Sequence, residues 1–266
     1  MPDRTWGGSV HFRCNICGAS NMRNVASFHR EIPDCTGCGS TPRFRGLMKA
    51  FMEEVLGVKN AVLKDAPENK AIRGIGMTEW AGYASLLSKK YSFLETYFHA
   101  EPRLDIMDPS TCSYRDLDFI ICSEVLEHVL APVSKAVRNL RQMLRLGGVL
   151  IFSVPFTDRE STLEHFPGLS DYSVCQIGDK WLVVNANQDG TYTVFDREIH
   201  FHGGPGTVLE MRLFARDDVI RLLAESDFSV KVLDEPDYEC GYYWPQIEER
   251  EGAGKNLSHI IAATAV

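Results

Sequence analysis

Two cysteine pairs near the N-terminus constrain this sequence more than any other feature. Cys14 and Cys17 form one C-x2-C pair, Cys35 and Cys38 form a second, and 17 residues separate the pairs. This spacing is typical of a structural zinc site, in which four thiolates surround the metal and leave no open position for catalysis. The sequence therefore predicts a zinc-ribbon module. Because so short a stretch has little core of its own, bound zinc would supply much of its folding free energy.

A helix is expected directly after the second cysteine pair. Pro42 suits the first turn of a helix, and apolar residues then recur at helical spacing from Phe44 to Val55. Two arginines near its start, Arg43 and Arg45, are expected on a solvated basic face; the alternative is that they hold a phosphate or an acidic substrate group.

Residues 1–58 are assigned to the zinc-ribbon module with its helix, and residues 59–266 to a larger domain. In that domain strand-like and helix-like runs alternate, which predicts an α/β fold with a Rossmann-like, doubly wound, mostly parallel sheet of seven strands. Residues 156–206 interrupt the pattern after the fifth strand. They contain an expected β-hairpin around Asp189-Gly190 and are predicted to form a substrate lid. The expected strands are KAIRGIG, YSFLE, RLDIMD, LDFIIC, VLIFSVP, FSVKVL and HIIAATAV.

Charge and composition limit the partners of this protein. The net charge is −8, but residues 1–50 carry seven basic and three acidic side chains, which leaves −12 for the rest of the chain. Nucleic-acid binding depends on neutralising phosphates, so we expect no nucleic-acid partner for the acidic body. No apolar stretch approaches the ~20 residues needed to span a bilayer, and the N-terminus lacks the apolar core of a signal peptide. The expected location is cytoplasmic, and the oligomeric state is not specified.

From about residue 60 onward, the order of these elements resembles the class I S-adenosylmethionine-dependent methyltransferases. The stretch that carries most of the resemblance is LDFIICSEVLEHVLAPVSKAVRNLRQMLRLGGVLIFSVPF. The resemblance implies S-adenosylmethionine as cofactor and a binding site at the carboxyl ends of the strands. It places Gly74 and Gly76 in the glycine loop beside the methionine half of the cofactor. Glu95 would accept hydrogen bonds from both ribose hydroxyls, and Ser123 would pass beside the methionine moiety.

The resemblance also implies that Asp105 or Asp108, in the expected third strand, lies near the adenine. The chain departs from the family pattern at Ile72, where an acid two residues before the first glycine is usual. The segment between the second and third strands is also too short for the usual helix. These departures leave a noncatalytic relative as an alternative.

The stretch ICSEVLEHV predicts the acceptor side of the site. In a helix starting near Glu124, the side chains of Glu124, Glu127 and His128 would share one face. Small-RNA 2'-O-methyltransferases and ubiquinone-pathway O-methyltransferases carry a similar E-x-x-E-H, which binds a divalent ion. The small-RNA group adds a histidine, for which His200 and His202 are candidates and His202 is preferred. Three interpretations stay open: a magnesium, manganese or zinc site, a metal-free acid/base site, and a pocket wall.

The leading hypothesis is methylation of a hydroxyl on a small-molecule or carbohydrate acceptor, such as a sugar, glycan precursor or natural product. Coordination to a cation would lower the pKa of such a hydroxyl. One alternative is an RNA methyltransferase in which the zinc module grips RNA. Another is a noncatalytic, zinc-stabilised binding protein.

Overall fold

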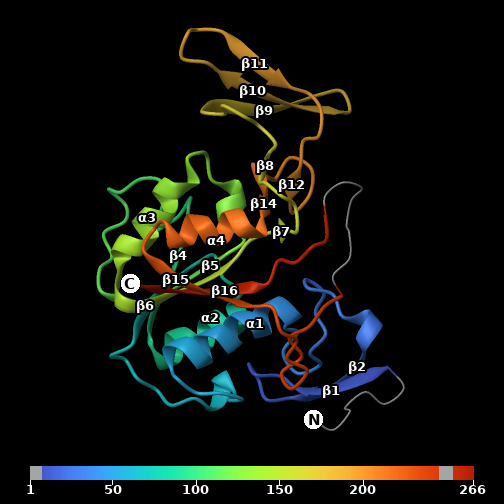
Figure 1. The fold of residues 1–266 in the computed structure, drawn as a ribbon, viewed down its shortest axis with the longest axis vertical. Helices are drawn as coiled ribbons and strands as arrows, with labels where there is room; N and C mark the ends of the chain where they lie inside the picture. Colours follow the sequence, from blue (N-terminus) through green and yellow to red (C-terminus); the bar gives the residue numbers. More distant parts are fainter. Residues whose placement is uncertain (1–7, 246–253) are drawn as a thin grey trace.

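The computed structural model describes residues 8–245 and 254–266. At its centre is a six-stranded sheet with the order β15-β16-β6-β5-β3-β4 (Figure 1). Strands β4, β3, β5 and β6 pair in parallel, whereas β16 runs antiparallel to both β6 and β15. The predicted α/β class with a mostly parallel sheet is confirmed. The strands are β3 (Arg73–Met77), β4 (Ser92–Thr96), β5 (Leu117–Ser123), β6 (Leu144–Ser153), β15 (Phe228–Leu233) and β16 (Ile260–Ala265).

Helices cover both faces of this sheet, as the doubly wound pattern predicts. One face carries α1 (Pro42–Ala50), its continuation η2 (Phe51–Val55), and α2 (Ala81–Lys90). The other face carries α3 (Val133–Met143) and α4 (Arg216–Ala224). Alternate residues of β5 point to the two sides, because successive side chains of a strand face opposite ways. Phe119 therefore packs in the core between the sheet and helices α1 and α2. Ile120 packs in the core between the sheet and helices α3 and α4.

The third expected strand, residues 103–108, is not formed, so the sheet has six strands in place of the predicted seven. Only an isolated bridge between Tyr97 and Arg103 marks its place. The carboxylate of Asp105 accepts a hydrogen bond from the Met107 amide at 2.9 Å, and Asp108 binds the Ser110 amide at 3.0 Å. Such side-chain bonds to nearby backbone groups stabilise turns at the expense of extended pairing.

The N-terminal module packs directly on the sheet. Its hairpin, β1 (Ser9–Arg13) and β2 (Ser20–Asn24), is antiparallel, and its apolar residues share one core with the face that α1 and α2 cover. One short 3-10 turn, η1 (Val25–Ser27), lies within the module, and a second, η3 (Leu63–Asp65), follows it.

The expectation that Arg45 lies on a solvated face is wrong. Its side chain is fully buried, with Nη1 2.6 Å from Asp34 Oδ1 and Nη2 2.7 Å from the Gly241 carbonyl. A buried guanidinium is tolerated here because a carboxylate and carbonyl oxygens satisfy its donors.

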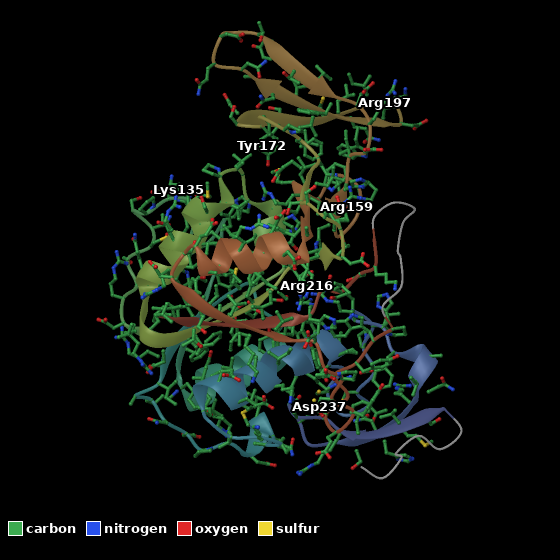
Figure 2. All side chains as sticks on the ribbon, viewed as in Figure 1. Lys135, Arg159, Tyr172, Arg197, Arg216 and Asp237 are labelled. Atoms are coloured by element: carbon green, nitrogen blue, oxygen red, sulfur yellow. The ribbon has the colours of Figure 1, made fainter. Side chains whose placement is uncertain are left out.

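The segment after β6 builds a separate layer. Strands β9, β10 and β11 form a three-stranded antiparallel sheet that projects away from the central sheet (Figure 1). Tyr172 and Arg197 mark this projecting sheet in Figure 2. The predicted hairpin segment supplies β10 and β11, and β9 adds a third strand. The strands of the layer are β7 (Phe156–Thr157), β8 (Leu163–Glu164), β9 (Asp171–Ile177), β10 (Lys180–Ala186), β11 (Tyr192–Phe195), β12 (Phe201–His202), β13 (Val208–Leu209) and β14 (Arg212–Ala215).

Among the described residues, no helix combines the length and apolarity that crossing a bilayer requires.

Candidate functional site

The carboxyl ends of the parallel strands meet at one edge of the sheet. Gly76 of β3 is in register with Glu95 of β4 and with Ile121 of β5, and Ser123 at the end of β5 is in register with Ser153 of β6. The loops that follow these strands therefore emerge side by side, where α/β sheets bind their ligands. The structure thus brings together the predicted cofactor positions at Gly76, Glu95 and Ser123.

The two glycines of β3 are surrounded by side chains. A Cβ on Gly74 would lie 2.3 Å from the ring of Phe119, and a Cβ on Gly76 would lie 2.7 Å from both Glu79 and Phe93. Packing of neighbouring side chains therefore accounts for the absence of side chains at these positions. The segment that turns over the sheet edge is the following loop, in which Thr78 adopts a positive φ of 58°.

Glu79, in that loop, is a carboxylate that the sequence patterns did not single out. Its side chain folds back over Gly76, accepts the Met77 amide at 3.4 Å and accepts the hydroxyl hydrogen of Tyr83. Its own backbone amide donates to the carboxylate of Glu95. Burial, reinforced by the nearby charge of Glu95, raises the pKa of Glu79 to about 7.

The N-terminal module reaches the same edge through the start of α1. The Arg43 guanidinium donates to the hydroxyl of Ser123, and its Nε lies 2.8 Å from Glu31 Oε1. Phe44 stacks on Trp80 of the β3 loop with ring centroids 4.8 Å apart. Arg43 is only 13% exposed, so the expectation of a solvated basic face is wrong here as well.

The chain after β5 forms no helix from Glu124, contrary to the prediction. Glu124 has a φ of 57°, and only a short 3-10 turn, η4 (Leu126–His128), follows. Its carboxylate binds Arg30 at 2.6 and 3.1 Å and accepts the Ser153 hydroxyl at 2.8 Å. Burial alone would raise the pKa of Glu124, but the ion pair with Arg30 outweighs it and lowers the pKa to about 2.

Glu127 and His128 instead meet His202, so one member of the predicted set, Glu124, lies outside this cluster. Each of the three residues offers a ligand atom within 4.8 Å of the others. His128 Nε2 lies 3.6 Å and His202 Nδ1 lies 3.9 Å from Glu127 Oε1. The other candidate, His200, packs against His165 with ring centroids 4.6 Å apart.

The arrangement of these three side chains makes the cluster a candidate cation site. Glu127 is fully buried, and neither carboxylate oxygen has a hydrogen-bond partner among the described residues. His128 Nδ1 donates to the Leu209 carbonyl at 2.9 Å, which leaves Nε2 unprotonated and facing Glu127. The side chain of His202 is 47% exposed, so the cluster is open to solvent on that side.

Residues that directly follow the insertion hold this cluster in place. The Met211 amide donates to the Glu127 carbonyl at 2.7 Å, and Arg212 Nη1 donates to the Leu126 carbonyl at 2.8 Å. Arg212 is 1% exposed and its Nε is 2.7 Å from Glu164. No local pattern indicates this role for Arg212, because its partners lie more than 40 residues away in sequence.

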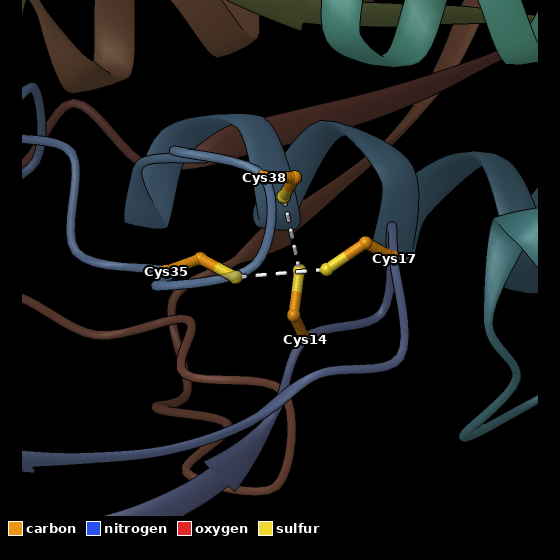
Figure 3. Close-up of side chains that lie close together, drawn as sticks. All are labelled: Cys14, Cys17, Cys35 and Cys38. Atoms are coloured by element: carbon orange, nitrogen blue, oxygen red, sulfur yellow. Dashed lines mark hydrogen bonds between the residues drawn. The ribbon is translucent and has the colours of Figure 1, made fainter.

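The four cysteines of the N-terminal module converge on one point (Figure 3). Their sulfur atoms lie within 4.8 Å of one another, with Cys14 to Cys38 at 3.8 Å and Cys17 to Cys35 at 3.6 Å. Tetrahedral coordination with Zn–S bonds of about 2.3 Å implies sulfur separations of about 3.8 Å. The predicted four-cysteine cluster is therefore present.

The mostly parallel sheet and the side chains at its carboxyl edge are typical of a methyltransferase of the α/β class. Comparison with known proteins supports the same class. Residues 79–230, more than half of the chain, match a family described as "Methyltransferase domain". The chain belongs to this family, and the resemblance to S-adenosylmethionine-dependent methyltransferases is confirmed. Comparison with curated proteins found no match.

Solved structures with a similar chain path include three methyltransferases. An S-adenosylmethionine-dependent methyltransferase from Mesorhizobium loti is 14% identical, with 82% of this chain and 100% of that chain covered and a TM-score of 0.41. A sugar N-methyltransferase from Streptoalloteichus sp. is 14% identical over 84% and 91%, with a TM-score of 0.40. An amino pentose methyltransferase from Micromonospora echinaspora is 11% identical over 86% and 93%, with a TM-score of 0.43. At these values, none of the three indicates the acceptor of this chain.

Proposed function

We propose that this protein transfers a methyl group from S-adenosylmethionine to a hydroxyl of a sugar, glycan precursor or small natural product, and that a divalent cation held by Glu127, His128 and His202 assists. The observation that carries this proposal is the buried carboxylate of Glu127, which lies beside two imidazoles and has no hydrogen-bond partner among the described residues. Burying a carboxylate without partners is costly, and a bound cation would offset that cost.

The donor set fits a cation that accepts both nitrogen and oxygen ligands. Two imidazoles and one carboxylate suit zinc or manganese better than magnesium, which prefers oxygen ligands. Three protein ligands leave positions open on the solvent side of His202. A divalent ion held by these residues would lower the pKa of a coordinated acceptor hydroxyl. Leu209, through its carbonyl, keeps the His128 ring oriented for this role.

The residues at the sheet edge fit the cofactor, which supplies the methyl group. Glu95 at the end of β4 can accept hydrogen bonds from ribose hydroxyls, and Ser123 lies four positions before Glu127, so the two sites adjoin. Asp105 or Asp108, in the segment between β4 and β5, is proposed to lie beside the adenine. Because the cofactor site and the cation cluster adjoin, an acceptor oxygen held by the cation would be oriented toward the methyl group.

We further propose that Cys14, Cys17, Cys35 and Cys38 hold a structural zinc ion. Their sulfur separations support this, as does the filling of all four ligand positions by thiols. The cytoplasm keeps cysteine thiols reduced, as a zinc site of four thiolates requires. The proposed zinc site is therefore compatible with the proposed cytoplasmic location.

The test combines metal analysis with methyl transfer from labelled S-adenosylmethionine to a panel of sugars and alcohols. Wild type should hold two metal ions per chain, and Glu127→Ala and His202→Ala should each hold one and lose at least about 100-fold in turnover. His11→Ala, which removes an exposed histidine of β1, is the matched control and should behave as wild type. Equal metal content in wild type and His202→Ala would contradict the cation site. Transfer that persists in both variants would contradict the role of the cluster.

A further inference from the structure

The departure at Ile72 raises the question of which groups at the sheet edge recognise the amino-acid end of the cofactor. That end carries a carboxylate and an ammonium group, so its recognition requires a cation and an anion close together. The described chain offers both at this edge, from parts of the sequence that the family resemblance does not cover or does not assign.

The cation is Arg43 of α1, within the four-cysteine module. It is bonded to Ser123, the residue expected beside the methionine moiety. Its Nε is held by Glu31, and Nη2 has no hydrogen-bond partner within the described chain. The guanidinium also lies over the ring of Phe44 at 4.7 Å, which fixes its plane. Arg43 is thus oriented in advance and retains donors for a carboxylate.

The anion is Glu79 of the loop after β3. Its side chain bends over Gly76, so it stands at the carboxyl edge of the sheet, whereas Ile72 precedes β3 at the opposite end of the strand. Its backbone amide is bonded to Glu95, the residue expected to bind the ribose. Glu79 therefore lies next to the position of the nucleoside.

Arg43 and Glu79 are linked through two aromatic rings. The Arg43 guanidinium lies over the Phe44 ring, the Phe44 and Tyr83 ring centroids are 5.7 Å apart, and the Tyr83 hydroxyl donates to Glu79. They form no ion pair with each other in the described structure, and the nearest partner of each is a different residue. A cation and an anion that lie at the same sheet edge and are held by different partners, Glu31 for Arg43 and Tyr83 for Glu79, suit a zwitterion placed between them.

We propose that Arg43 and Glu79 together bind the amino-acid end of S-adenosylmethionine, with Arg43 on its carboxylate and Glu79 on its ammonium group. This assignment rests on the proposed function. It also makes the four-cysteine module one wall of the cofactor site, since the helix that carries Arg43 follows the second cysteine pair directly. Gly76 has a matching role, because any side chain there would displace Glu79.

The test uses calorimetric binding of three ligands at pH 8: S-adenosylhomocysteine, its decarboxylated derivative, and 5'-deoxy-5'-methylthioadenosine, which lacks the amino-acid end. Arg43→Ala should weaken binding of S-adenosylhomocysteine by about 10- to 100-fold and leave the other two ligands within about threefold. Glu79→Gln should weaken the two ligands that carry an amine by about 10-fold and spare methylthioadenosine. Arg43→Lys should recover part of the loss, because the charge is retained.

Arg13→Ala is the matched control, since Arg13 belongs to the same module and is 62% exposed. It should bind all three ligands as wild type does, and circular dichroism shows whether each variant is folded. If the variants lost affinity equally for all three ligands, or lost none, the assignment of Arg43 and Glu79 would be wrong. The proposed function would not be affected by that result. If wild type bound none of the three nucleosides, both this assignment and the proposed function would fail.

Discussion

Arg30 and Glu124 form a two-point ion pair that fastens the four-cysteine module to the loop after β5. Arg30 Nη2 lies 2.6 Å from Glu124 Oε1, and Nη1 lies 3.1 Å from Oε2. The two side chains are 8% and 9% exposed, and Arg30 Nε also donates to the Ser258 carbonyl at 3.1 Å. One guanidinium therefore joins three segments that are distant in sequence.

Removal of Arg30 should destabilise the whole protein. Arg30→Ala leaves the Glu124 carboxylate buried without its cation, which we expect to lower the free energy of unfolding by about 3–5 kcal/mol. Urea unfolding monitored by circular dichroism measures this change. The double variant Arg30→Ala/Glu124→Gln should recover part of the loss, because no charge remains unpaired. A loss below about 1 kcal/mol in the single variant would show that this pair behaves as an exposed one.

The sequence predicted the elements whose signals are local. Hydrophobic periodicity located the helices on both faces, and the spacing of the cysteines predicted their cluster. Strand ends also placed Gly76, Glu95 and Ser123 at one edge, because parallel strands share their carboxyl ends.

Features that depend on distant contacts could not be predicted in this way. Glu124 looks like a helix residue in the sequence, but a partner 94 positions away fixes it in a left-handed turn. In the sequence Arg43 and Arg45 look like a pair of surface residues. In the structure Arg43 donates to Ser123 and Arg45 donates to the Gly241 carbonyl, both distant in sequence. The expected third strand does not form, because Asp105 and Asp108 accept hydrogen bonds from backbone amides two residues further on. The spacing of apolar residues does not indicate such bonds.

Loss of zinc should destabilise the domain as well as the module. The module shares a core with the sheet, in which Phe12 and Ile16 belong to the same cluster as Ile260. Cys35→Ser should remove one zinc ion per chain and lower the midpoint of thermal unfolding by several degrees, because structural zinc contributes on the order of 10 kcal/mol in isolated modules. Metal analysis and calorimetry of unfolding measure both effects. Cys175→Ser, in the projecting sheet, is the matched control and should keep its zinc.

Glu79 should make stability depend on pH in a defined window. Burial raises the pKa of Glu79 to about 7 in the folded protein, against 4.5 as its ordinary value. Below pH 4.5 the carboxyl is protonated in both states and costs nothing. As the pH rises from 4.5 to 7, the unfolded state ionises while the folded state holds its proton, so stability falls by up to about 1.4 kcal/mol per pH unit. Above pH 7 both states are ionised and the cost is constant.

Glu79→Gln removes this cost, so it should be more stable than wild type at pH 8 and close to wild type at pH 4.5. The side chain remains partly exposed, which reduces the expected gain to on the order of 2 kcal/mol. Urea unfolding of both proteins at pH 4.5, 6, 7 and 8, without ligand, measures the difference. Glu68→Gln, which removes an exposed carboxylate, is the control. A difference between wild type and Glu79→Gln that stays constant from pH 4.5 to 8 would show that Glu79 has the same pKa in the folded and unfolded states, which would contradict the raised pKa.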